Sequence, residues 1–256
     1  MIDLWILVII FLAAFAAGLI NALAGGGTLV SFPVLIAMGI PPVTANVTNT
    51  IALCPGYFGG VVAQRRDFTS QKKRLYAILP ICILGGIVGG LFLIHSDERM
   101  FKVLVPYLIL MASLLLAVQV PLKEWLQSRP EKRGGVQAVR VGARGMLFLA
   151  SVYGGYFGAG VSVIVIAILG LIYDDSLTRL NFLKQAISFS INISAAVFFA
   201  FSGRVEWVLV FIMSVGSVIG GLAGGTCAGK ITSDTLRWVV VCIGITVSII
   251  YFIMGT

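Results

Sequence analysis

The residues with the clearest chemical potential lie in the apolar segment 178–201, where polar side chains share one face of the expected helix. Their spacings of three, four and four residues place Asn181, Lys184, Ser188 and Asn192 on one side, with Gln185 beside them. A lysine near the centre of a membrane helix costs about 2.5–3.5 kcal/mol, so it should face protein or a wet cavity. A fixed positive charge among amides and hydroxyls suits an anionic solute. Because Lys184 is about two turns from the helix start, snorkelling to the membrane interface is the alternative.

A second polar run lies between residues 44 and 50 and contains Asn46, Thr48 and Asn49. Aligning the two halves of the chain places Asn46 opposite Asn181 and Asn49 opposite Lys184. Asparagine and threonine side chains at this density either bond neighbouring helices or line a polar path. Because this run aligns with the polar face of segment 178–201, we favour the interpretation that it lines a polar path.

Two glycine-rich breaks each precede a short apolar segment. They read Gly25-Gly26-Gly27-Thr28 and Gly158-Ala159-Gly160-Val161-Ser162. A helix that restarts inside a membrane has free N–H groups and a partial positive charge at its N-terminus, which suits a backbone cradle for an anion or polar solute. A flexible hinge or a tight helix contact is the alternative. If the cradle exists, Gly26 and Gly160 should face one cavity with Lys184, and a valine at either glycine should block it.

The composition requires lipid as the solvent for these elements. Hydrophobic residues make up 59% and charged residues 11% of the chain, and the mean hydropathy is +1.05. Soluble domains carry about 25% charged residues. The net charge of +8 does not indicate nucleic-acid binding, because the basic residues lie in short loops between apolar runs. Isolated cysteines and a single histidine predict no metal site, and the absence of a nucleophile–base set or phosphate loop predicts no cofactor and no enzymatic activity.

Segment lengths predict an all-α polytopic bundle, because about 20 apolar residues cross a bilayer. We expect about eight spans, near 4–22, 43–63, 74–94, 100–119, 142–158, 178–201, 206–228 and 236–254. Leu29–Met38 and Val161–Ile172 are too short to cross alone, so they are predicted to be half-helices or re-entrant segments. If both instead crossed fully, the two halves would be inverted.

The chain also repeats itself beyond the glycine breaks. The glycine-rich run 85–90 returns as 216–221, and Ser96-Asp97 returns as Ser233-Asp234. We predict two homologous repeats, 1–120 and 141–256, joined by a basic cytoplasmic linker at 121–140. Small residues four apart let membrane helices approach closely, so the runs 85–90 and 216–221 should serve packing. Interrupted segments at matching places in two repeats point to the binding site of a secondary transporter.

Basic residues predict the orientation. Segments 64–74 and 119–144 hold 11 of the 18 lysines and arginines, so both should be cytoplasmic. With eight spans, Arg204 falls on the same side and both termini are cytoplasmic.

The glycine breaks and polar runs resemble a known family. Residues 25–35 followed by 38–50 resemble the first-half signature of the TauE/SafE family. The second half agrees at residues 154–160, 181–185, Asn192 and 203–207. The resemblance covers essentially the whole chain and implies a prokaryotic inner-membrane permease for export of sulfite, sulfonates or related organosulfur anions. One departure is Val161-Ser162, where relatives often continue with another glycine.

The sequence therefore predicts a secondary transporter of small sulfur-containing oxyanions, with the lipid bilayer and a small anionic solute as partners and no nucleic acid. The expected solute-binding residues are Gly25, Gly26, Gly27, Thr28, Asn46, Thr48, Asn49, Gly158, Gly160, Ser162, Asn181, Lys184, Gln185, Ser188 and Asn192. A passive anion channel and a permease for an unrelated small anion are the alternatives. The exact substrate, the direction of transport, a coupling ion and the oligomeric state stay open.

Overall fold

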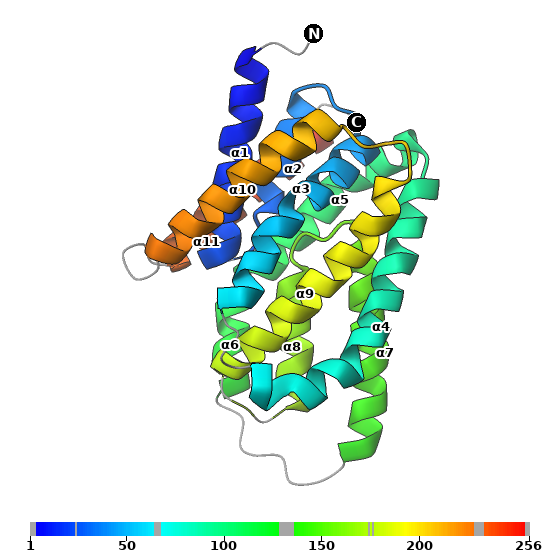
Figure 1. Ribbon diagram of the computed structural model, residues 1–256, viewed down its shortest axis with the longest axis vertical. Coiled ribbons are helices and arrows are strands. Elements are labelled where there is room, and N and C mark those ends of the chain that lie inside the picture. Colours follow the sequence, from blue (N-terminus) through cyan, green and yellow to red (C-terminus); the bar gives the residue numbers. More distant parts are fainter. Residues whose placement is uncertain are drawn as a thin grey trace.

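The protein is a bundle of α-helices (Figure 1). The computed structural model describes residues 4–23, 25–63, 68–127, 136–173, 175, 177–227 and 233–253. The helices in these ranges are α1 (Leu4–Leu23), α2 (Thr28–Ala37), α3 (Pro42–Ala63), α4 (Phe68–His95), α5 (Glu98–Ala117), α6 (Gln119–Gln127), α7 (Val136–Tyr156), α8 (Val161–Ile172), α9 (Leu177–Ala200), α10 (Trp207–Cys227) and α11 (Ser233–Ile253). The predicted all-α polytopic bundle is confirmed.

Among the described helices, six are both long and apolar enough to cross a membrane: α1, α4, α5, α9, α10 and α11. Helices α3 and α7 have 22 and 21 residues, so they also have the required length. They are less apolar because α3 carries the asparagines and threonines of the polar run and α7 carries two arginines. The eight segments expected to be spans are thus all helical, and six of them are apolar while two are long but more polar.

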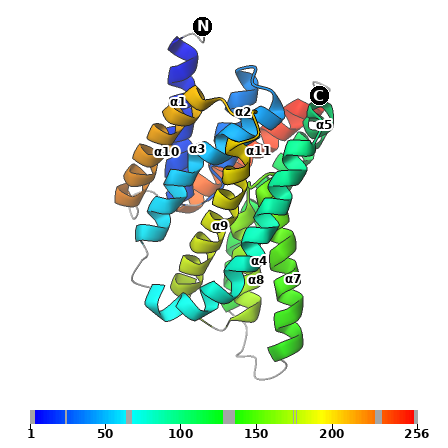
Figure 2. The same cartoon turned by 45° about the vertical axis from the view of Figure 1, so that its right-hand side comes forward.

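Each glycine break reverses the direction of the chain. In Figure 1, α1 runs downward from the N-terminal end and α2 turns back upward, whereas α7 runs upward and α8 turns back downward. Figure 2 shows the same arrangement from another side. The start of α2 lies against α1, because a side chain at Gly27 would collide with the carbonyl oxygen of Ala17. The short segments are therefore re-entrant half-helices, and the two hairpins enter the molecule from opposite ends.

This reversal corrects the expected topology. The start of α1 and the end of α11 lie at the same end of the molecule as the connection between α9 and α10, which holds Arg204 (Figure 1). The described parts of segments 64–74 and 119–144 lie at the opposite end. The prediction that both termini and Arg204 share a side with the basic segments is wrong, because each hairpin returns to its own side instead of adding a crossing. The halves are also oppositely directed, although neither short segment crosses fully.

Corresponding helices of the two halves make corresponding contacts. Helix α1 packs along α10, as α7 packs along α4, while α3 crosses α9 and α5 crosses α11. A side chain at Gly89 would collide with the carbonyl oxygen of Val152 on α7, and one at Gly220 would collide with that of Phe15 on α1. The packing role predicted for these glycine runs agrees with both contacts. A common origin of the two halves stays a prediction.

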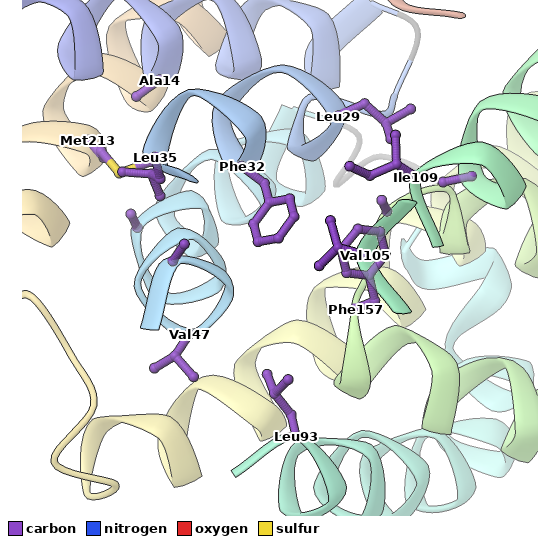
Figure 3. Packing of buried hydrophobic residues seen from close by; sticks show 14 of the residues in the cluster. Ala14, Leu29, Phe32, Leu35, Val47, Leu93, Val105, Ile109, Phe157 and Met213 are labelled. Carbon is purple, nitrogen blue, oxygen red and sulfur yellow. The ribbon is translucent and has the colours of Figure 1, made fainter. Parts of the chain in front are cut away.

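A cluster of buried aromatic rings joins the hairpins (Figure 3). The ring of Phe32 on α2 lies 5.4 Å from that of Phe157 in the second break, at an interplanar angle of 88°. Phe101 on α5 lies 6.5 Å from both rings. Edge-to-face pairs contribute about 0.5–1.5 kcal/mol each beyond the area they bury. Since lipid is as apolar as these side chains, such packing contributes more to holding the halves together than removal from water does.

Candidate functional site

The backbone at both breaks adopts a conformation that favours glycine. Gly25 and Gly26 have φ angles of 83° and 90°, and Gly158 and Gly160 have φ angles of 80° and 74°. This left-handed region costs a residue with a side chain roughly 1–2 kcal/mol. The four glycines therefore let α1 and α7 end, and α2 and α8 begin, within a few residues.

A side chain of the preceding helix braces each turn. The backbone N–H of Gly27 donates to Oδ1 of Asn21 at 2.8 Å, and the Tyr153 hydroxyl donates to the carbonyl oxygen of Ala159 at 2.6 Å. Neither Asn21 nor Tyr153 was among the residues predicted to form the site. For Asn21, the available signal was a lone amide near the end of an otherwise apolar span, a few residues before the break.

The two breaks meet α3 and α9 around one central pocket. Its lining is Asn21, Gly25, Gly26, Thr28, Tyr57, Gly158, Ala159, Gly160, Val161, Ser162, Lys184, Gln185 and Ser188. A Cβ atom at Gly25 would lie 3.2 Å from Oγ of Ser162, so the breaks face each other directly. The cavity is only about 10 Å³, roughly the space of one water molecule. The structure is therefore closed around this pocket.

The pocket combines a buried cation with polar groups and two helix N-termini. Lys184 is 8% exposed and lines the pocket, which favours the cavity over the snorkelling alternative. Ser188 is fully buried, and its Oγ has no hydrogen-bond partner among the described residues. Tyr57 was not among the predicted site residues, and its hydroxyl interacts with the side chains of Thr28 and Asn21. Among the residues that the structure describes, no acidic one lines the pocket. Because α2 and α8 also begin here, the local field favours an anion.

Several predicted site residues form structural hydrogen bonds outside the pocket lining. Nδ2 of Asn46 donates to the carbonyl oxygen of Tyr156 at the end of α7, at 2.8 Å. Oγ1 of Thr48 accepts from the backbone N–H of Glu206, just before α10, at 3.1 Å. These bonds match the alternative in which the polar run of α3 bonds neighbouring elements.

Asn49 and Asn192 also bond within the bundle, while Gly27 packs on α1. Oδ1 of Asn49 accepts from the Ser31 hydroxyl at 2.6 Å, and its buried Nδ2 lacks a partner. Nδ2 of Asn192 donates to the carbonyl oxygen of Ser188 one turn earlier, at 2.8 Å. Asn181 belongs to α9, but its side chain lies outside the described residues.

Gly26 and Gly160 line one pocket together with Lys184, as expected, but a side chain at either glycine would point toward α5. A Cβ atom at Gly26 would lie 3.1 Å from Cδ2 of Leu116, and one at Gly160 would lie 3.3 Å from Cα of Ala112. Both contacts are on α5. A valine at either position would therefore press on α5, and the glycine whose side chain would enter the space between the breaks is Gly25.

These features define a multi-pass membrane transporter with a cationic pocket between two oppositely directed helical hairpins. Residues 10–251 match the family model for the sulfite exporter TauE/SafE, so the chain belongs to that family. The resemblance seen in the sequence is confirmed.

Curated relatives carry transporter names. The chain is 26% identical to a "Probable membrane transporter protein" of Haemophilus influenzae over 86% of this chain and 84% of the relative. It is 23% identical to the "Probable membrane transporter protein YfcA" of Escherichia coli strain K12, over 88% and 81%. It is 25% identical to the "Probable membrane transporter protein ORF9" of a Sinorhizobium species, over 95% and 91%. No solved structure matches the chain significantly.

Proposed function

We propose that the protein carries small sulfur-containing oxyanions, such as sulfite or an organosulfonate, across the cytoplasmic membrane through the pocket between its hairpins. The observation that carries the proposal is the burial of Lys184 where the N-termini of α2 and α8 meet, with the unpartnered Ser188 hydroxyl beside it. One cation, two helix N-termini and no carboxylate suit an oxyanion. The description of the family supports sulfite as the first substrate to test.

The closed pocket favours a carrier over a channel. A space of about 10 Å³ admits no continuous path for an anion, so the elements around it must move during transport. Two hairpins that enter from opposite ends could open the pocket to either side in turn. The sequence contains no nucleotide-binding motif, so the solute gradient, a coupling ion or the membrane potential must drive transport. The potential contributes about 2.3 kcal/mol per charge per 100 mV to anion export from a cell that is negative inside.

Flux measurements in proteoliposomes test the substrate and the mechanism together. Sulfite, thiosulfate, sulfoacetate and taurine are compared with chloride and inorganic phosphate, using protein-free vesicles as the baseline. We expect saturable sulfite or sulfonate flux, and counterflow when unlabelled solute is placed on the opposite side. Preferred transport of chloride or phosphate would contradict the sulfur-oxyanion proposal. Non-saturating flux without counterflow would indicate a channel.

The orientation of the protein in the membrane can be tested by labelling the two ends of α4. The start of α4 is predicted to be cytoplasmic, and His95 lies at its opposite end. In a cysteine-free background, we expect His95→Cys to react with an impermeant maleimide added to intact cells. Lys72→Cys, exposed near the start of the same helix, should react only after permeabilisation. The reverse pattern would place the basic segments outside.

Contacts made by two carboxylates at opposite ends of the molecule are expected to hold the pocket closed. At one end Oε2 of Glu98 accepts from the backbone N–H of Val43 at 2.9 Å, where α3 begins. At the other end Asp175, which follows α8, pairs with Arg74 and accepts from Nε2 of Gln71 at 2.9 Å. These contacts link the first turn of α3 to α5 and the residue that follows α8 to α4.

We expect Asp175→Asn and Glu98→Gln to open the pocket to opposite sides. Each loses a partly exposed charged contact, so the population shift should reach at most about 5-fold. The measurement is the rate at which an impermeant thiol reagent labels Ser188→Cys from each side of oriented vesicles. Asp175→Asn should raise labelling from the side where α4 begins, and Glu98→Gln from the side where it ends. Equal changes from both sides would contradict a gating role for these contacts.

A further inference from the structure

A second and much larger pocket lies at the end of the molecule where α4 and α7 begin. Its volume is about 280 Å³, and it opens between α4, α7 and the C-terminal end of α8. Its polar lining comprises Lys73, Arg74, Arg144 and Tyr173, while Ile78 and Leu147 contribute to its apolar lining. This pocket is separate from the central one, because the two share no lining residue.

The bend of α4 creates the space. The first turns of α4 run across the lower end of the molecule before the helix turns upward beside α7 (Figures 1 and 2). Pro80 lies inside this helix, and a proline removes one backbone hydrogen bond and bends the chain. Further along, α4 and α7 are in close contact, because a side chain at Gly85 would collide with Ser151. The pocket therefore has a closed inner end and a wide outer end.

The charge of this pocket is only partly compensated. The Arg74 guanidinium pairs with Asp175 and lies 4.6 Å from the centre of the Tyr173 ring, so its position is fixed from two sides. Lys73 and Arg144 are exposed, and none of the described residues that line the pocket is acidic. Two exposed cations on different helices therefore face one cavity, which suits an anionic group large enough to contact both.

The surroundings identify the source of that anion. Beside the pocket, Tyr76 on α4 is 56% exposed, and Met146 and Leu149 on α7 are 53% and 68% exposed. In a chain that spans a membrane, such side chains face lipid acyl chains. Lys73 and Arg144 lie within about one turn of these side chains along their helices, at the end of the bundle, where lipid head groups meet water.

We propose that this pocket binds the head group of an anionic phospholipid. The phosphate contacts Lys73 and Arg144, the fixed Arg74 contributes positive charge at the back, and the acyl chains lie along the apolar surface of α4 and α7. Basic pockets between membrane helices on the cytoplasmic side are suited to such head groups. The inference does not depend on the solute carried by the central pocket.

Native mass spectrometry of the purified full-length protein tests this site. The protein is equilibrated with micelles that contain equal amounts of phosphatidylglycerol and phosphatidylcholine. We expect the wild type to retain phosphatidylglycerol preferentially and the Lys73→Gln/Arg144→Gln variant to bind it about 30-fold more weakly, as expected for two cations near an anionic surface. The control, Arg99→Gln/Lys102→Gln, removes two exposed cations from the opposite end and should retain the lipid normally. Equal retention by all three proteins, or an equal loss in both variants, would overturn the proposal.

Thermal unfolding separates a lipid head group from a soluble anion. Short-chain phosphatidylglycerol should raise the Tm of the wild type and of the control, but not that of the Lys73→Gln/Arg144→Gln variant. Inorganic phosphate alone should have little effect. If inorganic phosphate stabilises the wild type as much as the lipid does, the pocket binds a soluble anion and the lipid proposal is wrong. Circular dichroism checks that each variant keeps the helical content of the wild type.

Discussion

Replacing Lys184 by alanine is expected to abolish solute transport while the protein still folds and inserts. Within the described lining of the central pocket, Lys184 is the one charged residue, and it is 8% exposed. A hydrogen bond to a charged group contributes about 1.5–3 kcal/mol, so the affinity for an anion should fall about 10- to 100-fold. Loss of the cation also removes the preference for anions. Saturable sulfite flux in proteoliposomes, with binding measured by isothermal titration calorimetry, checks both effects.

Other variants show whether charge is the cause. Lys184→Arg keeps the charge and should restore part of the flux, whereas Lys184→Gln keeps a hydrogen-bonding group without charge and should not. Lys102→Ala removes an exposed cation from α5 and should transport normally. Normal flux through Lys184→Ala would mean that the residue serves only the structure of α9.

The polar face of α9 could be predicted because helical periodicity is a local property. Spacings of four residues place Lys184 and Ser188 on one side of any α-helix, whatever it packs against. The two breaks were equally visible, since consecutive or alternating glycines before a short apolar segment leave few other conformations. The structure brings these three features together at one pocket.

The side of α3 that faces the pocket could not be predicted in the same way. Its asparagines and threonines gave the stronger local signal, yet Tyr57 is the α3 residue found in the described part of the pocket lining. The rotation of α3 depends on distant partners, such as the carbonyl oxygen of Tyr156 that Asn46 binds and the N–H of Glu206 that Thr48 binds. Such contacts join residues more than 100 positions apart, so no local pattern reveals them.

The direction in which α2 and α8 run after the breaks could not be predicted from the sequence alone either. A short apolar segment of 10 or 12 residues is compatible with a half-helix that continues forward or one that turns back. The choice depends on the backbone angles of the glycines and on the contact between Gly27 and α1, neither of which hydropathy records. Because the short segments turn back, the start of α1, the end of α11 and Arg204 lie at the end of the molecule opposite the basic segments, and not at the same end as predicted.

Gly25 provides the sharpest test of the space between the breaks. A methyl group at this position would lie 3.2 Å from Oγ of Ser162, which is closer than an ordinary van der Waals contact. It would occupy part of a cavity that is about 10 Å³ in the closed state. The φ angle of 83° adds a backbone cost of roughly 1–2 kcal/mol for alanine, so stability must be separated from function.

Gly39 is the matched control, because its φ angle is 86° and no atom lies within 4 Å of a Cβ atom placed there. Gly25→Ala and Gly39→Ala should therefore lose similar stability, and both should still fold. We expect only Gly25→Ala to lose solute binding and flux, since only its methyl group enters the space between Ser162 and the first break. Thermal unfolding measures the shared backbone cost, and sulfite flux measures the difference. If the two variants transport equally well, or fail equally, the solute does not pass between the two breaks and the proposed site is wrong.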